Sequence, residues 1–141
     1  MARKTLTPIQ KRFSDIDIFR HVNNVAQQMY FDAGKTDYYR RTFGHDILYD
    51  NLRIVTVSTS TSYMSQIRYD DDIAVETSTE RVGNKSMTLF QRIVRSESDG
   101  GQTVCSESRS TMVAFDFEAQ QSVRVPDSWR ELLLAETPDI L

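Results

Sequence analysis

The stretch that decides the fold runs from residue 23 to residue 44 and reads NNVAQQMYFDAGKTDYYRRTFG. Val25, Met29, Ala33 and Asp37 recur in it at four-residue spacing, with Ala26 and Tyr30 flanking them, which predicts one long helix. The helix is expected to run to about residue 43, because Gly44 is a natural stop.

The start of this helix is marked by two adjacent asparagines. Either Asn23 or Asn24 is a suitable N-cap, since a short amide oxygen can accept hydrogen bonds from the free N–H groups of a first turn. Ala33 and Gly34 lie in the middle of the segment, where glycine costs about 1 kcal/mol of helix propensity. A close approach of the helix to a sheet would explain why such a small pair is tolerated there.

The rest of the chain has β texture, rich in Val, Thr, Ser and Tyr after residue 50. A strand is expected before the helix and four after it, followed by a short helix that begins at Pro126. The expected strands are 7–14, 52–64, 73–79, 86–96 and 103–117, with turns at 82–85 and 99–101. This order predicts a single α+β domain over residues 1–141, an antiparallel sheet of about five strands covered by one long helix.

Composition excludes several classes of protein. The chain has 141 residues and a net charge of −3, so a dedicated nucleic-acid-binding protein is not expected. One cysteine and two histidines argue against a disulfide framework or a structural zinc site. No stretch approaches the roughly 20 apolar residues that span a bilayer. The first residues, MARKTLTPIQKRF, lack the apolar run of a secretory signal, so the expected location is the cytoplasm.

Chemistry concentrates in the loop that leads into the helix. This loop holds Asp15, Asp17, His21 and the asparagine pair within a few residues. A carboxylate beside the N-terminus of a helix can act as a base or a nucleophile on a carbonyl that the helix N–H groups polarise. The residues alone leave an alternative open, in which the aspartates form turns, His21 holds the loop and the asparagines only cap the helix.

The same loop carries a family resemblance. Asp17-x-x-x-His21-Val22-Asn23-Asn24, followed by Tyr30-Phe31-Asp32 and Lys35, resembles the signature of the 4-hydroxybenzoyl-CoA thioesterase family of hot-dog proteins. The likeness continues through Tyr63–Asp71, Gly83–Ser86 and Val125-Pro126, and so covers nearly the whole chain. It implies a hot-dog fold, in which an antiparallel sheet wraps around one central helix.

The resemblance also implies an activity, the hydrolysis of a fatty or aromatic acyl-CoA thioester. Asp17 would serve as nucleophile or as general base for water, and the N–H of Asn24 or Val25 would polarise the thioester carbonyl. No metal or cofactor is needed for this chemistry. Active sites of the family lie between subunits, which implies a homodimer or a homotetramer.

The candidate site residues follow from this resemblance. The catalytic candidates are Asp17, His21, Asn23 and Asn24, and the substrate-binding candidates are Arg20, Val25, Tyr30 and Asp32. The chain departs from the family pattern at Arg20, where glycine is usual, and at Asp32, where glutamate is usual. Asp15 is expected to be structural or exposed rather than catalytic, and Cys105 a buried filler of the core. The alternatives are an acyl-CoA-binding protein without activity and, less favoured, a hot-dog hydratase acting on an enoyl thioester.

Overall fold

The computed structural model describes residues 4–44 and 52–135. Its elements in chain order are β1 (Lys4–Ile9), the 3-10 turn η1 (Phe13–Asp15), α1 (Asn24–Phe43), β2 (Leu52–Tyr63), β3 (Ile73–Val82), β4 (Ser86–Ser96), β5 (Gln102–Asp116), β6 (Gln121–Val123) and α2 (Asp127–Leu134).

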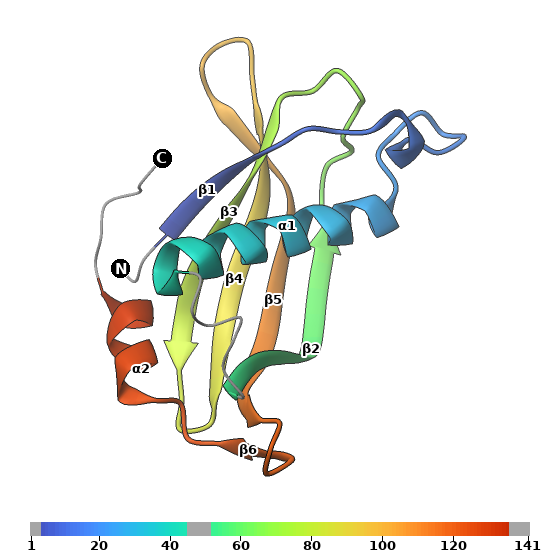
Figure 1. The fold of residues 1–141 in the computed structure, drawn as a ribbon. Coiled ribbons are helices and arrows are strands. Elements are labelled where there is room, and N and C mark those ends of the chain that lie inside the picture. The colour runs from blue at the N-terminus through green and yellow to red at the C-terminus, as the bar shows by residue number, and fades with distance from the viewer. Residues whose placement is uncertain (1–3, 45–51, 136–141) are drawn as a thin grey trace.

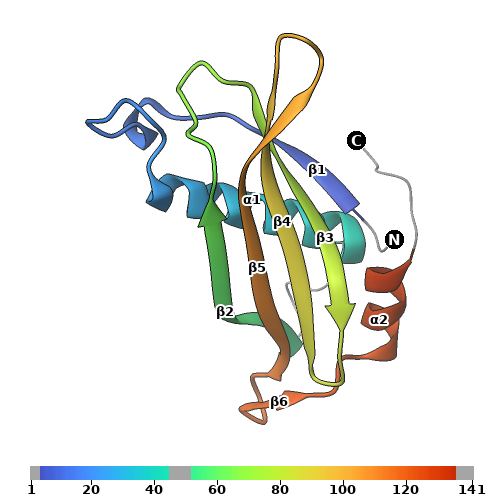
Figure 2. The ribbon, with the colours of Figure 1, turned by 180° about the vertical axis from the view of Figure 1, so that it is seen from behind.

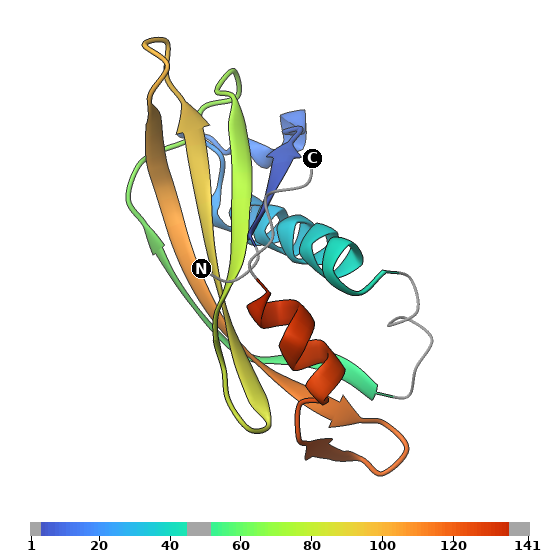
Figure 3. The ribbon, with the colours of Figure 1, turned by 90° about the vertical axis from the view of Figure 1, so that its left-hand side faces the viewer.

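The strands form one antiparallel sheet in the order β1-β3-β4-β5-β2, and the short β6 pairs with β5. α1 crosses one face of this sheet (Figure 1), and α2 lies on the same side (Figure 3). The view from behind shows the strands in front of α1 (Figure 2). The predicted α+β class and hot-dog arrangement are confirmed, with β6 as a sixth, three-residue strand that is too short to give a periodic signal.

α1 approaches the sheet closely at Gly34. A Cβ atom built at Gly34 would lie 2.6 Å from Cγ1 of Val75 in β3 and 3.0 Å from Nε2 of Gln91 in β4. No real Cβ atom tolerates the first of these distances. The expectation that a small residue permits close approach to a sheet is therefore confirmed, and the propensity cost of glycine is offset by packing.

The buried residues of α1 follow the predicted pattern only in part. Val25 and Met29 are 73% and 50% exposed, and Ala33 is exposed as well. The buried residues of the helix are instead Ala26, Gln27, Tyr30, Phe31, Gly34, Lys35, Tyr38 and Thr42. Of the predicted pattern, the flanking Ala26 and Tyr30 are therefore buried but the central row is not. Apolar residues occupy both sides of this helix, and the close approach at Gly34 decides which side meets the sheet.

The ends of α1 lie where the sequence predicts them. Asn23 is the N-cap and Gly44 the C-cap, the latter in a left-handed conformation with a φ of +75°. At the far end of the chain, Pro126 precedes α2 as its N-cap. Leu133 is buried in the core, whereas Leu132 is 40% exposed.

The strands after α1 agree with the predicted ranges to within a few residues, but the first strand does not. β1 covers Lys4–Ile9, and the predicted continuation to residue 14 is wrong because the chain bends into η1. Phe13, which lies within the predicted strand, is part of this turn and is 87% exposed. The bend is held by Asp15, whose carboxylate accepts a hydrogen bond from the backbone N–H of Arg12 at 2.9 Å.

Candidate active site

Residues 16–22 fold into a small closed loop directly before α1. Ile16 and Val22 form an antiparallel bridge. Inside it, the N–H of Asp17 donates to the carbonyl of His21 at 3.1 Å, and the N–H of Arg20 donates to the carbonyl of Asp17 at 3.0 Å. These bonds fix Asp17 at one side of a tight turn whose position is set by the sheet below.

Arg20 occupies the sharpest position of this loop. Its φ is +67°, in the left-handed region that favours glycine. The family's usual glycine at this position thus has a backbone reason, which Arg20 meets at the cost of strain. The Arg20 side chain is exposed and does not line the cleft that Asp17 faces.

The Asp17 carboxylate is exposed and only partly engaged. Its Oδ1 accepts a hydrogen bond from the N–H of Phe19 at 2.9 Å. Among the residues that the structure describes, Oδ2 has no hydrogen-bond or ion-pair partner. One carboxylate oxygen thus orients the side chain, and the other can receive a proton or attack.

The start of α1 offers free hydrogen-bond donors beside this carboxylate. Oδ1 of Asn23 accepts from the N–H of Ala26 at 2.7 Å, and the Asn23 carbonyl accepts from the N–H of Gln27 at 3.1 Å. The N–H groups of Asn24 and Val25 precede any intrahelical acceptor, and within residues 4–44 and 52–135 neither has a partner. They carry the partial positive charge of the helix terminus.

Asp17 and these donors line the same open cleft, with a volume of about 560 Å³. One wall comes from the loop and the first turns of α1, and the other from the segment that leaves β2. Figure 1 shows the start of α1 beside the end of β2. The lining residues are Asp17, Phe19, His21, Val22, Asn23, Asn24, Val25, Gln27, Tyr63, Met64, Ser65 and Gln66.

Asp15 differs from Asp17 in both its burial and its hydrogen bonding. It is 2% exposed, and its Oδ2 accepts a bond of 2.6 Å from the Tyr30 hydroxyl. Its Oδ1 lies 3.0 Å from the guanidinium of Arg12. Burial alone would raise the pKa of Asp15, but the hydrogen bonds from Tyr30 and Arg12 outweigh it and hold this pKa below its usual value. The structural role expected for Asp15 is confirmed.

The structure brings five of the eight candidate site residues into the cleft, namely Asp17, His21, Asn23, Asn24 and Val25. The other three candidates, Arg20, Tyr30 and Asp32, do not line it. Tyr30 is buried and bonded to Asp15, and burial raises the pKa of its hydroxyl. The Asp32 side chain is 77% exposed and lies 3.8 Å from the ammonium of Lys35.

Sequence reasoning missed the second wall of the cleft and Gln27. Gln27 is 3% exposed, and its Oε1 has no hydrogen-bond partner among the described residues. The wall residues 63–66 lie within Tyr63–Asp71, a segment singled out only for its resemblance to a strand entry. The resemblance of this segment to the family was the signal that the sequence offered, but no local pattern within the segment indicates a site.

Cys105 is not part of this chemistry. It is fully buried, as expected for a core filler. Burial raises the pKa of its thiol, although the nearby Arg95 opposes this. A thiol with a raised pKa is a poor nucleophile. Among the described residues, no group of three His, Cys, Asp or Glu side chains is close enough to hold a metal ion. None of the described helices has the length and hydropathy needed to cross a membrane.

Comparison with known proteins places this geometry in context. The model of the thioesterase-like superfamily matches residues 12–133. The Bacillus subtilis protein YsmA is 27% identical over 128 residues, which cover 89% of this chain and 82% of YsmA. A predicted thioesterase from Bacillus stearothermophilus superposes with a TM-score of 0.82 and 30% identity, covering 96% of this chain and 99% of that one.

A further solved structure is similar in fold at lower identity. It is a mutant 4-hydroxybenzoyl-CoA thioesterase in complex with 4-hydroxybenzoyl-CoA. It superposes with a TM-score of 0.84 at 19% identity, and the match covers 94% of this chain and 99% of that chain.

Proposed function

The chain belongs to the thioesterase-like superfamily and is a thioester hydrolase, and from this premise we propose that it hydrolyses an acyl-CoA to the free acid and coenzyme A in the Asp17 cleft. One observation carries the proposal. A carboxylate with an unpaired oxygen and two unpaired helix N–H groups, those of Asn24 and Val25, line one cleft. This pairing supplies both the attacking group and the stabilisation of the developing oxyanion.

The thioester carbonyl would bind at the start of α1. The N–H of Asn24 or Val25 donates to the carbonyl oxygen, and the donation strengthens as negative charge develops there. Asp17 either removes a proton from the attacking water or attacks the carbonyl carbon itself. In both routes the C–S bond breaks and coenzyme A leaves as a thiolate, which takes up a proton. In the general-base route this proton comes from the attacking water by way of Asp17, and the free acid forms directly. In the nucleophilic route the acyl group and Asp17 form a mixed anhydride, which a water molecule then hydrolyses to the free acid and the restored Asp17 carboxylate.

His21 and Asn23 flank this centre on the wall of the cleft that the loop and the start of α1 form. Asn23 uses its amide oxygen to cap α1, which leaves its NH₂ group to donate to the substrate carbonyl or to water. His21 closes the loop through its backbone carbonyl, and its half-buried ring lines the cleft. We assign both side chains to orienting substrate and water around Asp17.

We further propose that the working unit is a homodimer or a homotetramer. Within the described part of the chain β2 is an edge of the sheet, and Val57 on it is 58% exposed. Beside the cleft, Ile18 and Phe19 are 90% and 73% exposed. Edge strands and large exposed apolar side chains are commonly covered by association. A second copy would cover both and narrow the open cleft into a binding slot.

A thiol-release assay over aliphatic and aromatic acyl-CoAs tests the hydrolase. Release of coenzyme A from at least one thioester supports it. Thermal stabilisation by acyl-CoA without any thiol release would instead favour an acyl-CoA-binding protein, and hydration of an enoyl-CoA would favour a hydratase. Single-turnover reactions in ¹⁸O-labelled water separate the two routes, because only nucleophilic attack puts label into Asp17.

A further inference from the structure

The inner face of the sheet changes character beyond the strands that α1 covers. α1 packs mainly on β1, β3 and β4, where Val75, Leu89 and Ile93 are buried and apolar. On β5 and β2 the same face carries serines and threonines in cross-strand pairs. We call this region the polar seam, and its members are Gln28, Lys35, Thr59, Thr61, Ser108 and Ser110.

Hydroxyl groups are paired across the two strands of the polar seam. Thr59 and Ser110 are 3.1 Å apart at their oxygens, and Thr61 and Ser108 are 3.0 Å apart. Gln28 reaches from α1 to Thr61, to which its Nε2 donates at 2.9 Å. Ser108 and Ser110 on β5 are 2% and 1% exposed, whereas Thr59 on β2 is exposed and Thr61 is half-buried. Each pair therefore joins the interior of the sheet to its more accessible edge strand.

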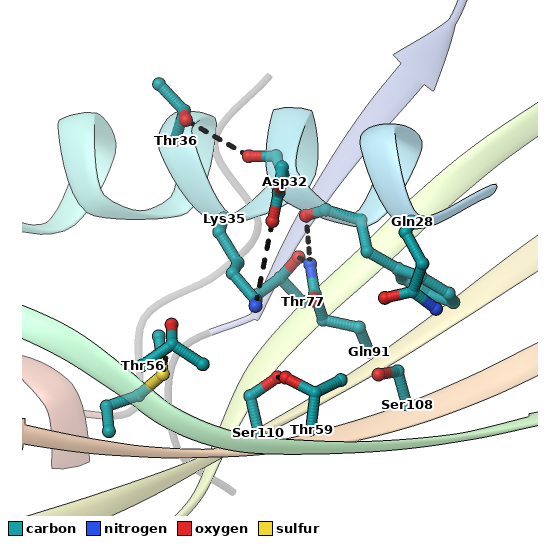
Figure 4. Close-up of polar contacts among 12 residues, drawn as sticks. Gln28, Asp32, Lys35, Thr36, Thr56, Thr59, Thr77, Gln91, Ser108 and Ser110 are labelled. Atoms are coloured by element: carbon teal, nitrogen blue, oxygen red, sulfur yellow. Dashed lines mark hydrogen bonds and ion pairs between the residues drawn. The ribbon is translucent and has the colours of Figure 1, made fainter. Parts of the chain in front are cut away.

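Lys35 brings a positive charge into this interior. Its side chain is only 11% exposed, and its single carboxylate neighbour in the described part of the chain is Asp32, at 3.8 Å. Figure 4 shows Lys35 directed from α1 toward the sheet, on the side of the strands that carry Thr59 and Ser110. Burial lowers the pKa of Lys35, and the charge of Asp32 opposes this only in part.

The ammonium group of Lys35 lacks close acceptors. It carries three N–H donors, and among the described residues its carboxylate neighbour Asp32 lies 3.8 Å away, which is longer than a hydrogen bond. A methyl-ended acyl chain laid here would bury these donors without partners, at a cost in desolvation. A carboxylate, which only accepts hydrogen bonds, matches them.

We propose that the polar seam binds the far end of the acyl group and that Lys35 recognises a carboxylate there, so that the preferred substrates are thioesters of dicarboxylic acids. This inference rests on the proposed hydrolase for its reaction, and on the polar seam for its substrate class. Lys35 follows Asn24 on the same helix, about 16 Å along its axis. A long acyl chain spans that distance within one subunit, whereas a short one would have to enter from the cleft of a second copy.

Matched pairs of thioesters test the proposal. Thiol release is measured for butanoyl-CoA against succinyl-CoA, hexanoyl-CoA against adipoyl-CoA, and dodecanoyl-CoA against dodecanedioyl-CoA. At one chain length at least, we expect kcat/KM to favour the carboxyl-ended member about tenfold or more, as for a partly buried charged hydrogen bond. The chain length of the strongest preference then reports which of the two paths the acyl group takes.

Two variants should change the ratio of kcat/KM between the carboxyl-ended and the methyl-ended thioester in opposite directions. Lys35→Met removes the charge with little change in volume and should abolish the preference, while turnover of the methyl-ended thioester is kept. Asp32→Asn removes the competing carboxylate and should increase the preference. Lys85→Met, at an exposed lysine in the turn between β3 and β4, is the matched control and should change neither.

Three results would overturn the polar-seam proposal. The first is an equal kcat/KM for the two thioesters of every pair. The second is a Lys35→Met variant in which kcat/KM falls equally for both thioesters of a pair. The third is a Lys35→Met variant whose assembly state differs from that of the wild type. Calorimetric binding to the slow Asp17→Asn variant separates this proposal from the hydrolase. If no thioester is cleaved but succinyl-CoA or a longer analogue binds in a Lys35-dependent way, the hydrolase fails and the anion site stands.

Discussion

The two turns that precede α1 each contain an aspartate, and the protein uses them in opposite ways. In the turn of residues 12–15, Asp15 is buried and accepts hydrogen bonds on both carboxylate oxygens. In the turn of residues 17–21, Asp17 is exposed and one of its oxygens has no partner in the described structure. Two positions separate a carboxylate that holds the fold from one that faces the cleft.

This difference follows from where each turn lies relative to α1. The first turn packs under the helix, where the Tyr30 hydroxyl and the Arg12 side chain converge on Asp15. The second turn projects past the helix start, where, among the described residues, the N–H of Phe19 is the one group that bonds to the Asp17 carboxylate. Burial with partners lowers the free energy of the folded state, whereas an unpaired oxygen is what catalysis requires.

The largest expected effect comes from Asp17→Asn. We expect kcat for the best acyl-CoA to fall by about a thousandfold, because the base or nucleophile is lost. The melting temperature should stay near that of the wild type, since no side chain in the described part of the chain bonds to the Asp17 carboxylate. Thiol release and thermal unfolding measure the two effects. Near-native kcat over several acyl chain lengths would contradict the assigned role of Asp17.

Asp15→Asn should lower the stability and leave the activity largely unchanged, which is the reverse of Asp17→Asn. The Tyr30 hydroxyl and the Arg12 side chain lose a charged acceptor, so we expect the free energy of unfolding to fall by about 2 kcal/mol. Turnover at a temperature where the variant remains folded should stay within severalfold of the wild type. Denaturant unfolding measures the first effect. A variant that is as stable as the wild type but inactive would mean that the two aspartates exchange roles.

Acid pH should destabilise the protein partly through Asp15. Its pKa in the folded state lies below its ordinary value, so the unfolded chain takes up the proton first, at about pH 4. The stabilisation is thus fully present above that pH and is lost as pH falls through the folded-state pKa. Denaturant unfolding over an acid pH series should show a shallower loss in Asp15→Asn than in the wild type.

The smallest expected effect is a gain in stability when Arg20 is replaced. Arg20→Gly relieves a left-handed residue with a φ of +67° and should raise the free energy of unfolding by about 1 kcal/mol. Arg20→Ala is the matched control, because it removes the same side chain but keeps the strain. If both variants gain equally, the side chain rather than the backbone is the source. Activity should change little, since the Arg20 side chain does not line the cleft.

The sequence was a good guide where a local signal has a single physical meaning. Asn23 and Gly44 mark the ends of α1 because capping depends on a few adjacent residues. The turn before Ser86 and the alternation through β4 are local in the same sense. The signature from Asp17 to Asn24 likewise indicated the family. It also indicated the loop that forms one wall of the cleft.

The sequence failed where the outcome depends on distant residues. The four-residue pattern through Val25 and Met29 does not mark the buried side of α1, because the close approach of Gly34 to Val75 selects another side. Nothing adjacent to Asp15 reveals that Tyr30, 15 residues further along the chain, will bond to it. β2 pairs with β5 rather than with β3, its neighbour in sequence, and this pairing creates the rows of hydroxyl groups in the polar seam.

The sequence by itself determined the long helix, its caps, the strands that follow and the family to which their order belongs, because each of these depends on periodicity or on neighbouring residues. Only the tertiary structure decided which of two nearby aspartates is buried, which segment forms the second wall of the cleft and that Lys35 lies among hydroxyl groups. Those features arise from contacts between residues that are far apart in the chain. The packing energy that favours these contacts depends on the whole fold, so no local stretch of sequence encodes it.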